Sequence, residues 1–245
     1  MKILIPMVGC EIKNSLTGDT YCMALYEIGR KTILEHILEP LSKQKNAEFI
    51  FILDKRNVER YRLDDVIKLL IPNASIVVAQ GRTKGSACSC LLGLDYLIAD
   101  EPLIIVGGDQ LVTADLQDAV NLFVQNGWDG GVITFEDIHP RWSFVMLNEN
   151  GFVIEAAEKR PISNHATTGF YYFKRTSDFV ESAFQMIKKK ADYKGNFYVC
   201  PVYNEMILKQ KRIGIYHIQK EQYYNFNHLK GIELYEEYYR EGRSG

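Results

Sequence analysis

Apolar runs alternate with amphipathic segments along the first half of the chain. Near-continuous apolar stretches predict buried strands at residues 2–7, 48–54, 74–80, 102–109 and 130–136. Between them, apolar positions with helical spacing predict helices at residues 32–44, 63–71, 86–98 and 116–126. Strands that are apolar on both faces and alternate with helices are typical of a parallel sheet with helices on both sides. The pattern therefore predicts a Rossmann-like α/β fold, with a mixed, mostly parallel central sheet flanked by helices.

The pattern changes after about residue 138. Residues 143–159 and 167–174 alternate like the strands of hairpins, and Asn150-Gly151 is a signal for a two-residue turn. Further elements are expected as two helices, a strand and a last helix at 176–190, 200–210, 212–218 and 228–240. No linker-like tract or repeat separates the two parts. We predict a single domain, residues 1–245, made of a half at 1–138 and a smaller α+β half at 139–245.

Composition narrows the classes of partner. The chain has 245 residues, 47% of them hydrophobic, and a formal net charge of −2. This charge gives no electrostatic basis for binding nucleic acid or an anionic membrane, so a small molecule or a protein is the expected partner. The apolar run near the N-terminus is too short for a signal peptide, and no stretch reaches the roughly 18 apolar residues of a membrane span. We expect a cytoplasmic protein without a membrane span.

The sharpest chemical signal is the sequence PLIIVGGDQ at residues 102–110. A buried strand that ends in Gly-Gly-Asp places Asp109 at the carboxyl edge of the sheet, where such folds bind ligands. A carboxylate there is suited to Mg²⁺ bridged to phosphates, because Mg²⁺ takes one or two protein carboxylates and completes its shell with water and substrate oxygens. The alternative is a strand-end turn that uses Gly and Asp for their geometry.

Two weaker signals follow other strands. Gln80 ends the predicted strand at 74–80, and Gly85 opens the next helix, so both could meet a nucleobase or a phosphate. Glu158 and Lys159 follow another strand, and this pair could bind a sugar hydroxyl and neutralise a sugar phosphate. The alternatives are an ordinary glycine-opened helix and a solvated surface pair.

The ordered set of these segments resembles the sugar-phosphate nucleotidyltransferases, over roughly residues 2–218. The segments that carry the resemblance are TKGSAC at 83–88, GGDQ at 107–110, HPRWSFV at 139–145, EAAEKRPIS at 155–163, TTGFYYF at 167–173 and FYVCPVYNEMI at 197–207. The resemblance is strongest to a branch found with bacterial capsule and surface-polysaccharide genes. It implies the mixed α/β fold shared with nucleotide-sugar glycosyltransferases of the GT-A type.

The resemblance also implies a reaction and a set of roles. The reaction transfers a nucleotidyl group from a nucleoside triphosphate to a phosphorylated sugar or polyol and releases pyrophosphate, with Mg²⁺ as cofactor. Residues 1–138 would bind the nucleotide and residues 139–245 the acceptor. The catalytic residues would be Asp109 and Lys13. The nucleotide would meet Met7, Val8, Gly9, Gln80, Gly85, Ser86 and Gly108. The acceptor would meet Trp142, Glu158, Lys159 and Gly169. The metal would be held by Asp109 and Asn225.

The first loop departs from the family pattern G-x-G-x-R followed by P-K-P-L. Gly9 is kept, but Glu11 replaces the second glycine, Lys13 replaces the arginine, and Met23 stands where the family has a phosphate-binding lysine. A carboxylate at Glu11 raises the electrostatic energy of a polyphosphate beside it. Lys13 can supply a point charge without the fork geometry of arginine. The candidates to replace the missing lysine are Lys31, Arg82 and Lys84.

A second departure lies near the end of the chain. Many family members carry a second metal-binding aspartate in a D-T-G-T turn, where this chain has NFNH at residues 225–228. Asn225 could bind a metal through its carbonyl oxygen, without charge. The aromatic residues of the last helix are expected to pack against the sheet or against another copy of the chain, which would make the protein a homo-oligomer.

Three functions therefore stay open. The first is an active Mg²⁺-dependent nucleotidyltransferase. The second is a non-catalytic homologue that still binds a nucleotide or a sugar phosphate, which predicts Glu11 and Met23 at the triphosphate position and no lysine or arginine reaching it. The third is a glycosyltransferase that uses a ready-made nucleotide sugar, with Asp109 as its metal-binding acid.

Overall fold

The computed structural model describes residues 1–13, 20–44, 46–97 and 100–242. Its strands are β1 (Lys2–Met7), β2 (Glu11–Lys13), β3 (Thr20–Cys22), β4 (Glu27–Ile28), β5 (Lys31–Thr32), β6 (Glu48–Asp54), β7 (Ser75–Ala79), β8 (Leu103–Val106), β9 (Gln110–Val112), β10 (Gly130–Glu136), β11 (Ser143–Leu147), β12 (Val153–Glu158), β13 (His165–Phe173), β14 (Ile213–His217) and β15 (Tyr223–Asn225). Its α-helices are α1 (Ile33–Ser42), α2 (Lys55–Tyr61), α3 (Leu63–Leu70), α4 (Ser86–Leu91), α5 (Leu116–Gln125), α6 (Thr176–Lys188), α7 (Val202–Leu208) and α8 (Leu229–Glu241). None of these helices has the length and apolar character that a membrane crossing requires.

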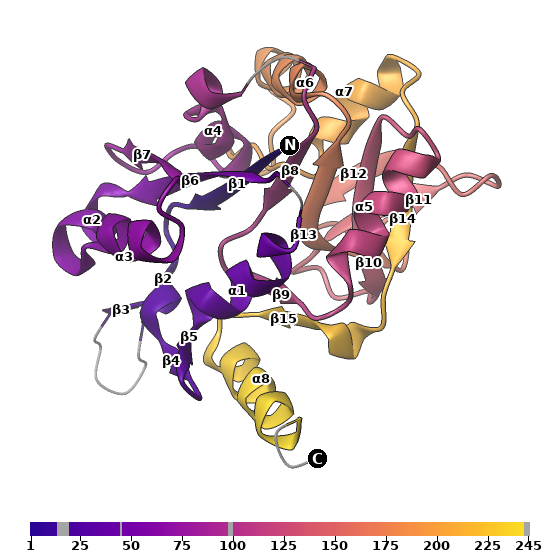
Figure 1. Ribbon diagram of the computed structural model, residues 1–245. Coiled ribbons are helices and arrows are strands. Elements are labelled where there is room, and N and C mark those ends of the chain that lie inside the picture. The colour runs from indigo at the N-terminus through magenta and orange to yellow at the C-terminus, as the bar shows by residue number, and fades with distance from the viewer. Residues whose placement is uncertain (14–19, 45, 98–99, 243–245) are drawn as a thin grey trace.

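Within the described residues, one sheet of nine strands runs through the molecule (Figure 1). Strands β8, β1, β6 and β7 are parallel, whereas β13 lies antiparallel to β8 and joins the sheet to β10, β11, β12 and β14. The predicted α/β fold, with a mixed central sheet flanked by helices, is confirmed. The sheet takes strands from both sides of residue 138, and that division into two halves stays a prediction.

The core has two layers because side chains alternate along the buried strands. In β1, Ile3 and Ile5 face one side of the sheet and Leu4 faces the other; in β6, Phe51 and Ile52 divide in the same way. Helices α1, α3 and α5 pack on the first face, and α4, α6 and α7 pack on the second. Near-continuous apolar strands are therefore explained by burial on both faces, as the sequence indicated.

The parallel strands bring the segments that follow them to one edge of the sheet. The chain turns from β6 into α2 without a loop, because Asp54 caps the helix by accepting a hydrogen bond from the backbone N–H of Arg56 at 2.9 Å. Helix α2 was not predicted from sequence. The predicted helix at 86–98 ends earlier, with α4 at Leu91 and a separate 3₁₀ turn at Leu94–Tyr96.

The predicted two-residue turn at Asn150-Gly151 is wrong. Strand β11 ends at residue 147 and β12 begins at residue 153, so five residues form the loop. The side-chain oxygen of Asn148 accepts hydrogen bonds from the backbone N–H groups of Asn150 and Phe152, both at 3.0 Å. The N–H of Asn148 still donates to the Phe152 carbonyl at 2.9 Å, so the hairpin is present, but the Asn148 side chain replaces the return bond from the Phe152 N–H and the loop is longer than its glycine alone indicated.

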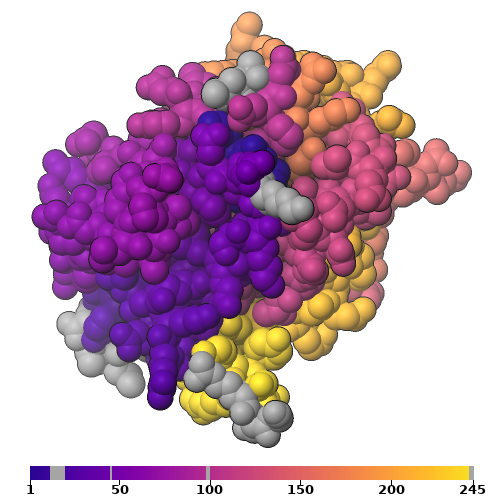
Figure 2. Space-filling model, in the orientation of Figure 1, coloured from indigo at the N-terminus to yellow at the C-terminus, as the bar shows by residue number. Residues whose placement is uncertain are grey.

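The end of the described chain returns to the first half. Strand β15 pairs antiparallel with β9, so that Asn225 lies opposite Gln110. Helix α8 then packs beside the N-terminal part of the chain, as the yellow and indigo surfaces at the bottom of Figure 2 show. The buried Tyr235 of α8 contacts His36 of α1 through its hydroxyl group, which lies 3.1 Å from the ring Nδ1 atom. The fold thus fixes β15 beside the strand that follows Asp109.

Candidate active site

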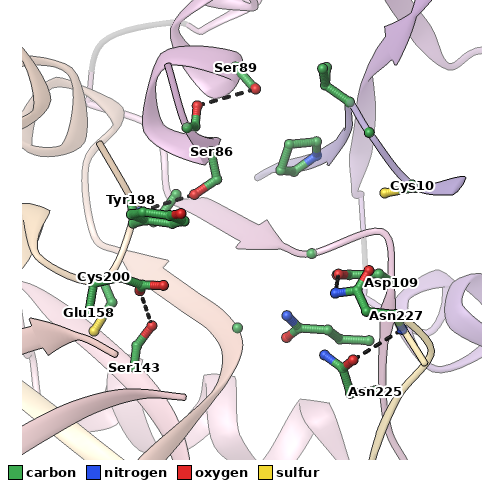
Figure 3. Close-up of a pocket in the computed structure, with 18 of the residues that line it drawn as sticks. Cys10, Ser86, Ser89, Asp109, Ser143, Glu158, Tyr198, Cys200, Asn225 and Asn227 are labelled. Carbon is green, nitrogen blue, oxygen red and sulfur yellow. Dashed lines mark hydrogen bonds between the residues drawn. The ribbon is translucent and has the colours of Figure 1, made fainter. Parts of the chain in front are cut away.

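A cleft of about 790 Å³ opens at the carboxyl edge of the parallel strands. Its predicted site residues are Val8, Gly9, Gly85, Ser86, Asp109, Trp142, Glu158, Lys159, Gly169 and Asn225. Its other charged or polar residues include Glu11, Arg56, Arg82, Thr83, Gln110, Arg141, Ser143, Tyr198 and Asn227. Figure 3 shows Asp109 and Glu158 on opposite sides of this space. Residues far apart in the sequence are therefore gathered around one cavity.

Asp109 lies at the end of a glycine-rich turn between β8 and β9. Its side chain accepts a hydrogen bond from the amide of Asn227, and its backbone oxygen accepts one from the N–H of Phe226 at 2.8 Å. Burial raises the pKa of the Asp109 carboxyl group, and the hydrogen bond from Asn227 opposes that shift. A cation bound at this carboxylate would remove the cost of burying its charge.

The donor atoms around Asp109 suit a hard cation. Carboxylate and amide oxygens come from Asp109, Asn225 and Asn227, and these are the ligand types that Mg²⁺ accepts. The described residues contain no cluster of three or more His, Cys, Asp or Glu that could hold a metal ion. A cation at Asp109 would therefore need water and substrate oxygens to complete its shell.

Asn225 and Asn227 share the turn that follows β15. The side-chain oxygen of Asn225 accepts a hydrogen bond from the backbone N–H of Asn227 at 3.1 Å, and Figure 3 shows this bond directly below Asp109. The predicted metal-binding oxygen of Asn225 is thus used within the turn, and its metal role stays a prediction. Asn227 was not predicted, although it belongs to the same NFNH segment.

Glu158 and Lys159 end strand β12 on the opposite side of the cleft. Glu158 is buried and accepts a hydrogen bond from the hydroxyl group of Ser143. Burial raises the pKa of this carboxyl group, and the bond from Ser143 opposes the shift. Lys159 has a left-handed backbone with φ of 51°, and its ammonium nitrogen lies 5.3 Å from the ring centre of Tyr198. Glu158 is thus buried with its own partner, and Lys159 is exposed beside Tyr198, so the two are not a solvated surface pair.

Trp142 closes the same side of the cleft. Its indole N–H donates to Asp137 at 3.0 Å, and the guanidinium carbon of Arg141 lies 4.2 Å from its ring centre. Gly169, with φ of 80°, leaves the room that the side chain of Gln110 fills. The amide oxygen of Gln110 is buried and has no hydrogen-bond partner among the described residues, so it can accept one from a ligand.

The predicted nucleotide side is shaped by a close approach of two segments. A side chain at Gly85, where φ is 96°, would overlap the backbone of Phe197. The hydroxyl group of Ser86 accepts a hydrogen bond from the N–H of Val199 at 3.3 Å, and the hydroxyl oxygens of Thr83 and Ser89 lie 2.6 Å apart. The loop before α4 is therefore fixed against the second half of the chain.

Other predicted nucleotide contacts lie outside the lining of the cleft. Met7 and Gly108 are buried beneath it, and Gln80 is exposed at the end of β7. Any contact of Met7 or Gly108 with a ligand would have to use the backbone. The side chain of Lys13 lies outside the described residues, although its backbone belongs to β2. The binding roles of these four residues stay predictions.

The altered first loop has a cationic neighbour that the sequence did not indicate. Glu11 lies 3.8 Å from the guanidinium group of Arg56, which also contacts Asp54 at 3.3 Å. Met23 is 1% exposed and belongs to the core, so it does not reach the cleft. Of the three candidate cations, Arg82 lines the cleft, whereas Lys31 pairs with Glu39 and Lys84 lies outside the lining.

Fold and cleft together define an α/β protein with one large cleft at the carboxyl edge of its parallel strands, as the resemblance indicated. A model of the nucleotidyl transferase family matches residues 15–206, and the chain belongs to this family. No curated protein matches the sequence.

Solved structures share the fold at low sequence identity. A nucleoside-diphosphate-sugar pyrophosphorylase from Vibrio cholerae RC9 is 23% identical, with a TM-score of 0.78 over 94% of this chain and 98% of that one. A putative glucose-1-phosphate thymidylyltransferase from Bacillus anthracis is 18% identical, with a TM-score of 0.73 over 95% and 92%. An inositol-1-phosphate CTP transferase from T. maritima is 14% identical, with a TM-score of 0.73 over 95% and 94%.

Proposed function

We propose that this protein transfers a nucleoside monophosphate from a nucleoside triphosphate to a phosphorylated sugar or polyol and releases pyrophosphate. The observation that carries the proposal is the placement of Asp109 and the Glu158–Lys159 pair on opposite sides of one cleft. Family membership and the names of the similar structures, which include a sugar-phosphate and an inositol-phosphate enzyme, support the same reaction.

In the proposed reaction, a phosphate oxygen of the acceptor attacks the α-phosphorus of the triphosphate, and pyrophosphate leaves as that bond breaks. The protein contributes mainly by position and charge. Lys159 neutralises the acceptor phosphate, and Glu158 accepts a hydrogen bond from an acceptor hydroxyl group. Gly85 and Ser86 face the nucleotide. Asp109 would hold Mg²⁺, which would neutralise the charge that develops on the phosphate oxygens.

Cations around the cleft favour an active enzyme over a non-catalytic homologue. The non-catalytic alternative predicts Glu11 and Met23 at the triphosphate position and no lysine or arginine reaching it. Glu11 does line the cleft, but Met23 is in the core, and Arg56 and Arg82 line the same cleft. Because the sequence resembles capsule-associated enzymes, we further propose that the activated product serves the synthesis of a capsule or surface polysaccharide. Mass spectrometry of the product would identify the sugar or polyol.

The test is a screen for pyrophosphate release. The protein is incubated with Mg²⁺, each of CTP, UTP, GTP, ATP and dTTP, and a panel of sugar and polyol phosphates. We expect release with one pair, and we expect Asp109→Ala to lower the rate by about 10²-fold or more, as for loss of a charge-stabilising group. Asp118→Ala, an exposed change on α5, is the matched control and should keep the activity. Silence with every pair would reject the proposal, and sugar transfer from a nucleotide sugar without pyrophosphate release would favour a glycosyltransferase.

A further inference from the structure

Arg56 lines the cleft beside Glu11, whose carboxylate lies 3.8 Å from its guanidinium group. We infer that Arg56, with Arg82, binds the β- and γ-phosphates of the triphosphate, and that Glu11 holds the Arg56 guanidinium group in place until the nucleotide displaces it. This inference rests on the proposed function. It names the side chains that replace the lost lysine at Met23 and gives the unusual Glu11 a role.

The backbone fixes Arg56 at the sheet edge. Because α2 begins directly after β6, its second residue cannot move away from the cleft without opening the helix. Asp54, whose side chain is 6% exposed, accepts bonds from the Arg56 backbone N–H at 2.9 Å and from Nε at 3.4 Å, and it pairs with Nη2 at 3.3 Å. The buried carboxylate therefore orients the guanidinium group from below. An arginine has five N–H donors, so others remain for a phosphate.

The contact with Glu11 is looser than the contact with Asp54. The Glu11 carboxylate lies 3.8 Å from Nη2, which is an ion pair beyond hydrogen-bond distance. The Arg56 side chain is 55% exposed, so phosphate oxygens can reach it from the cleft. Because Arg56 neutralises Glu11, the carboxylate repels an incoming polyphosphate less than it would alone. Phosphate oxygens can then replace Glu11 as the partner of the guanidinium group.

Arg82 adds a second cation to the same part of the cleft. It is exposed in the loop between β7 and α4, next to Thr83, and it lines the cleft together with Arg56 and Glu11. Burial acts to raise the pKa of Asp54, but the hydrogen bonds from Arg56 and its charge lower the pKa overall. The positive charge of Arg82 adds a smaller lowering. The positive charges of both arginines thus act on one buried carboxylate.

Other cations in the described region are used elsewhere. Lys31 pairs with Glu39 at 2.7 Å, and Arg141 stacks on Trp142 at the acceptor side. Arg60, one turn after Arg56 on α2, packs over the ring of Tyr61 at 5.1 Å; it lines a neighbouring hollow with Arg56 and Glu11 but not the main cleft. Arg56 therefore lines the main cleft because of its position on α2, and not only because arginines are frequent in this helix.

The experiment compares triphosphate with monophosphate binding. Calorimetry with excess Mg²⁺ identifies which of CTP, UTP, GTP, ATP and dTTP binds most tightly, and the same base is then used as its monophosphate. We expect Arg56→Gln to weaken triphosphate binding by about 10- to 100-fold, the range for losing a hydrogen bond to a charged group. Monophosphate binding should change less than about twofold, which also shows that the variant is folded.

Two further variants complete the comparison. Arg60→Gln makes the same charge change one turn along α2 and should leave both affinities within about twofold, because an exposed charge outside the site contributes little. Glu11→Gln removes the competitor for Arg56 and should tighten triphosphate binding by up to about fivefold. In the double variant of Glu11 and Arg56, that gain should disappear.

The outcomes separate this inference from the proposed function. Unchanged triphosphate affinity in Arg56→Gln, or equal losses for triphosphate and monophosphate, overturns the inference even if pyrophosphate is still released. If triphosphate binding depends on Arg56 but no acceptor leads to pyrophosphate release, the proposed function is overturned and the inference is supported. A wild-type protein that binds none of the five triphosphates overturns both.

Discussion

Two carboxylic acids face each other across the cleft, and within the described part of the chain neither accepts a hydrogen bond from a lysine or an arginine. Burial raises the pKa of both Asp109 and Glu158, and their bonds come from the neutral groups of Asn227 and Ser143. Asp137 differs: burial acts to raise its pKa, but bonds led by that from Lys220 lower it to about 2. The two site carboxylates are therefore the ones that gain most from a bound cation or a ligand hydroxyl group.

This difference predicts how Glu158 affects stability with pH. The pKa of Glu158 is higher in the folded protein than in the unfolded chain, so the fold favours its protonated form. The stabilisation is complete below the unfolded pKa of about 4.3 and is lost as the pH rises through the folded value. Urea unfolding of Glu158→Gln and wild type should therefore show an advantage for the variant that grows as the pH rises above about 4.3 and levels off above the folded pKa. A difference that is constant or shrinks would contradict this account.

At the scale of elements, the last strand and helix complete the site. Strand β15 brings Asn225 and Asn227 to Asp109, and α8 anchors β15 through Tyr235. The ring of Tyr235 lies 5.0 Å from that of Tyr224 in β15 and 5.1 Å from that of His36 in α1. One aromatic side chain thus joins three elements around the C-terminal side of the cleft.

Removing that side chain should destabilise the protein. Because Tyr235 is 6% exposed, Tyr235→Ala is expected to lower the free energy of unfolding by about 3–5 kcal/mol, the range for large-to-small changes in a core. Tyr238→Ala is the matched change on the same helix and should cost about 1 kcal/mol or less, because Tyr238 is 47% exposed. Urea denaturation measures both, and equal losses would show that α8 does not depend on its buried contact.

The sequence predicted those strands and helices in which burial gives the apolar residues a regular spacing. Strands β1, β6 and β8 are apolar on both faces, and α1 and α5 have one apolar face, so their patterns were informative. Helix α2 has little apolar periodicity, and its start depends on Asp54 acting as a cap. The Asn150-Gly151 turn failed because the side chain of Asn148 competes for the same backbone groups.

For the whole molecule, the two sides of the cleft are joined at a few close contacts. The backbone of Phe197 meets the loop at Lys84 and Gly85, with its N–H donating to the Lys84 oxygen at 2.8 Å. The hydroxyl group of Ser86 adds the bond to Val199. These contacts link the segment before α4 to the segment before α7, and they leave little freedom for the sides of the cleft to separate there.

The close approach at Gly85 predicts a cost for any side chain. Gly85→Ala should lower the free energy of unfolding by at least about 1 kcal/mol, because φ of 96° is strained for alanine and the methyl group meets the Phe197 backbone. Gly81→Ala lies in the same loop, where a methyl group would meet no atom within 4 Å, and should be nearly neutral. Thermal unfolding of the two variants makes the comparison, and similar midpoints would mean that the loop moves freely.

Residues whose place in the cleft depends on local order were predictable from the sequence, whereas their binding and catalytic roles stay predictions. Asp109, Glu158 and Lys159 were predicted because each follows a strand that is recognisable by its pattern, and the sheet gathers such positions at one edge. Arg56 and Asn227 could not be predicted in this way. Their places depend on a helix without a preceding loop and on a strand pairing between distant segments, and neither leaves a periodic signal in the sequence.

The bond between Asn227 and Asp109 joins positions 118 residues apart, which has a consequence for biosynthesis. Asp109 leaves the ribosome long before its amide partner has been translated, while the strands around it can already pair. A nascent chain therefore carries this acid in a half-built environment until β15 is made. The nucleotide affinity that we propose should therefore arise late in translation, after most of the sheet has formed, rather than grow gradually with chain length.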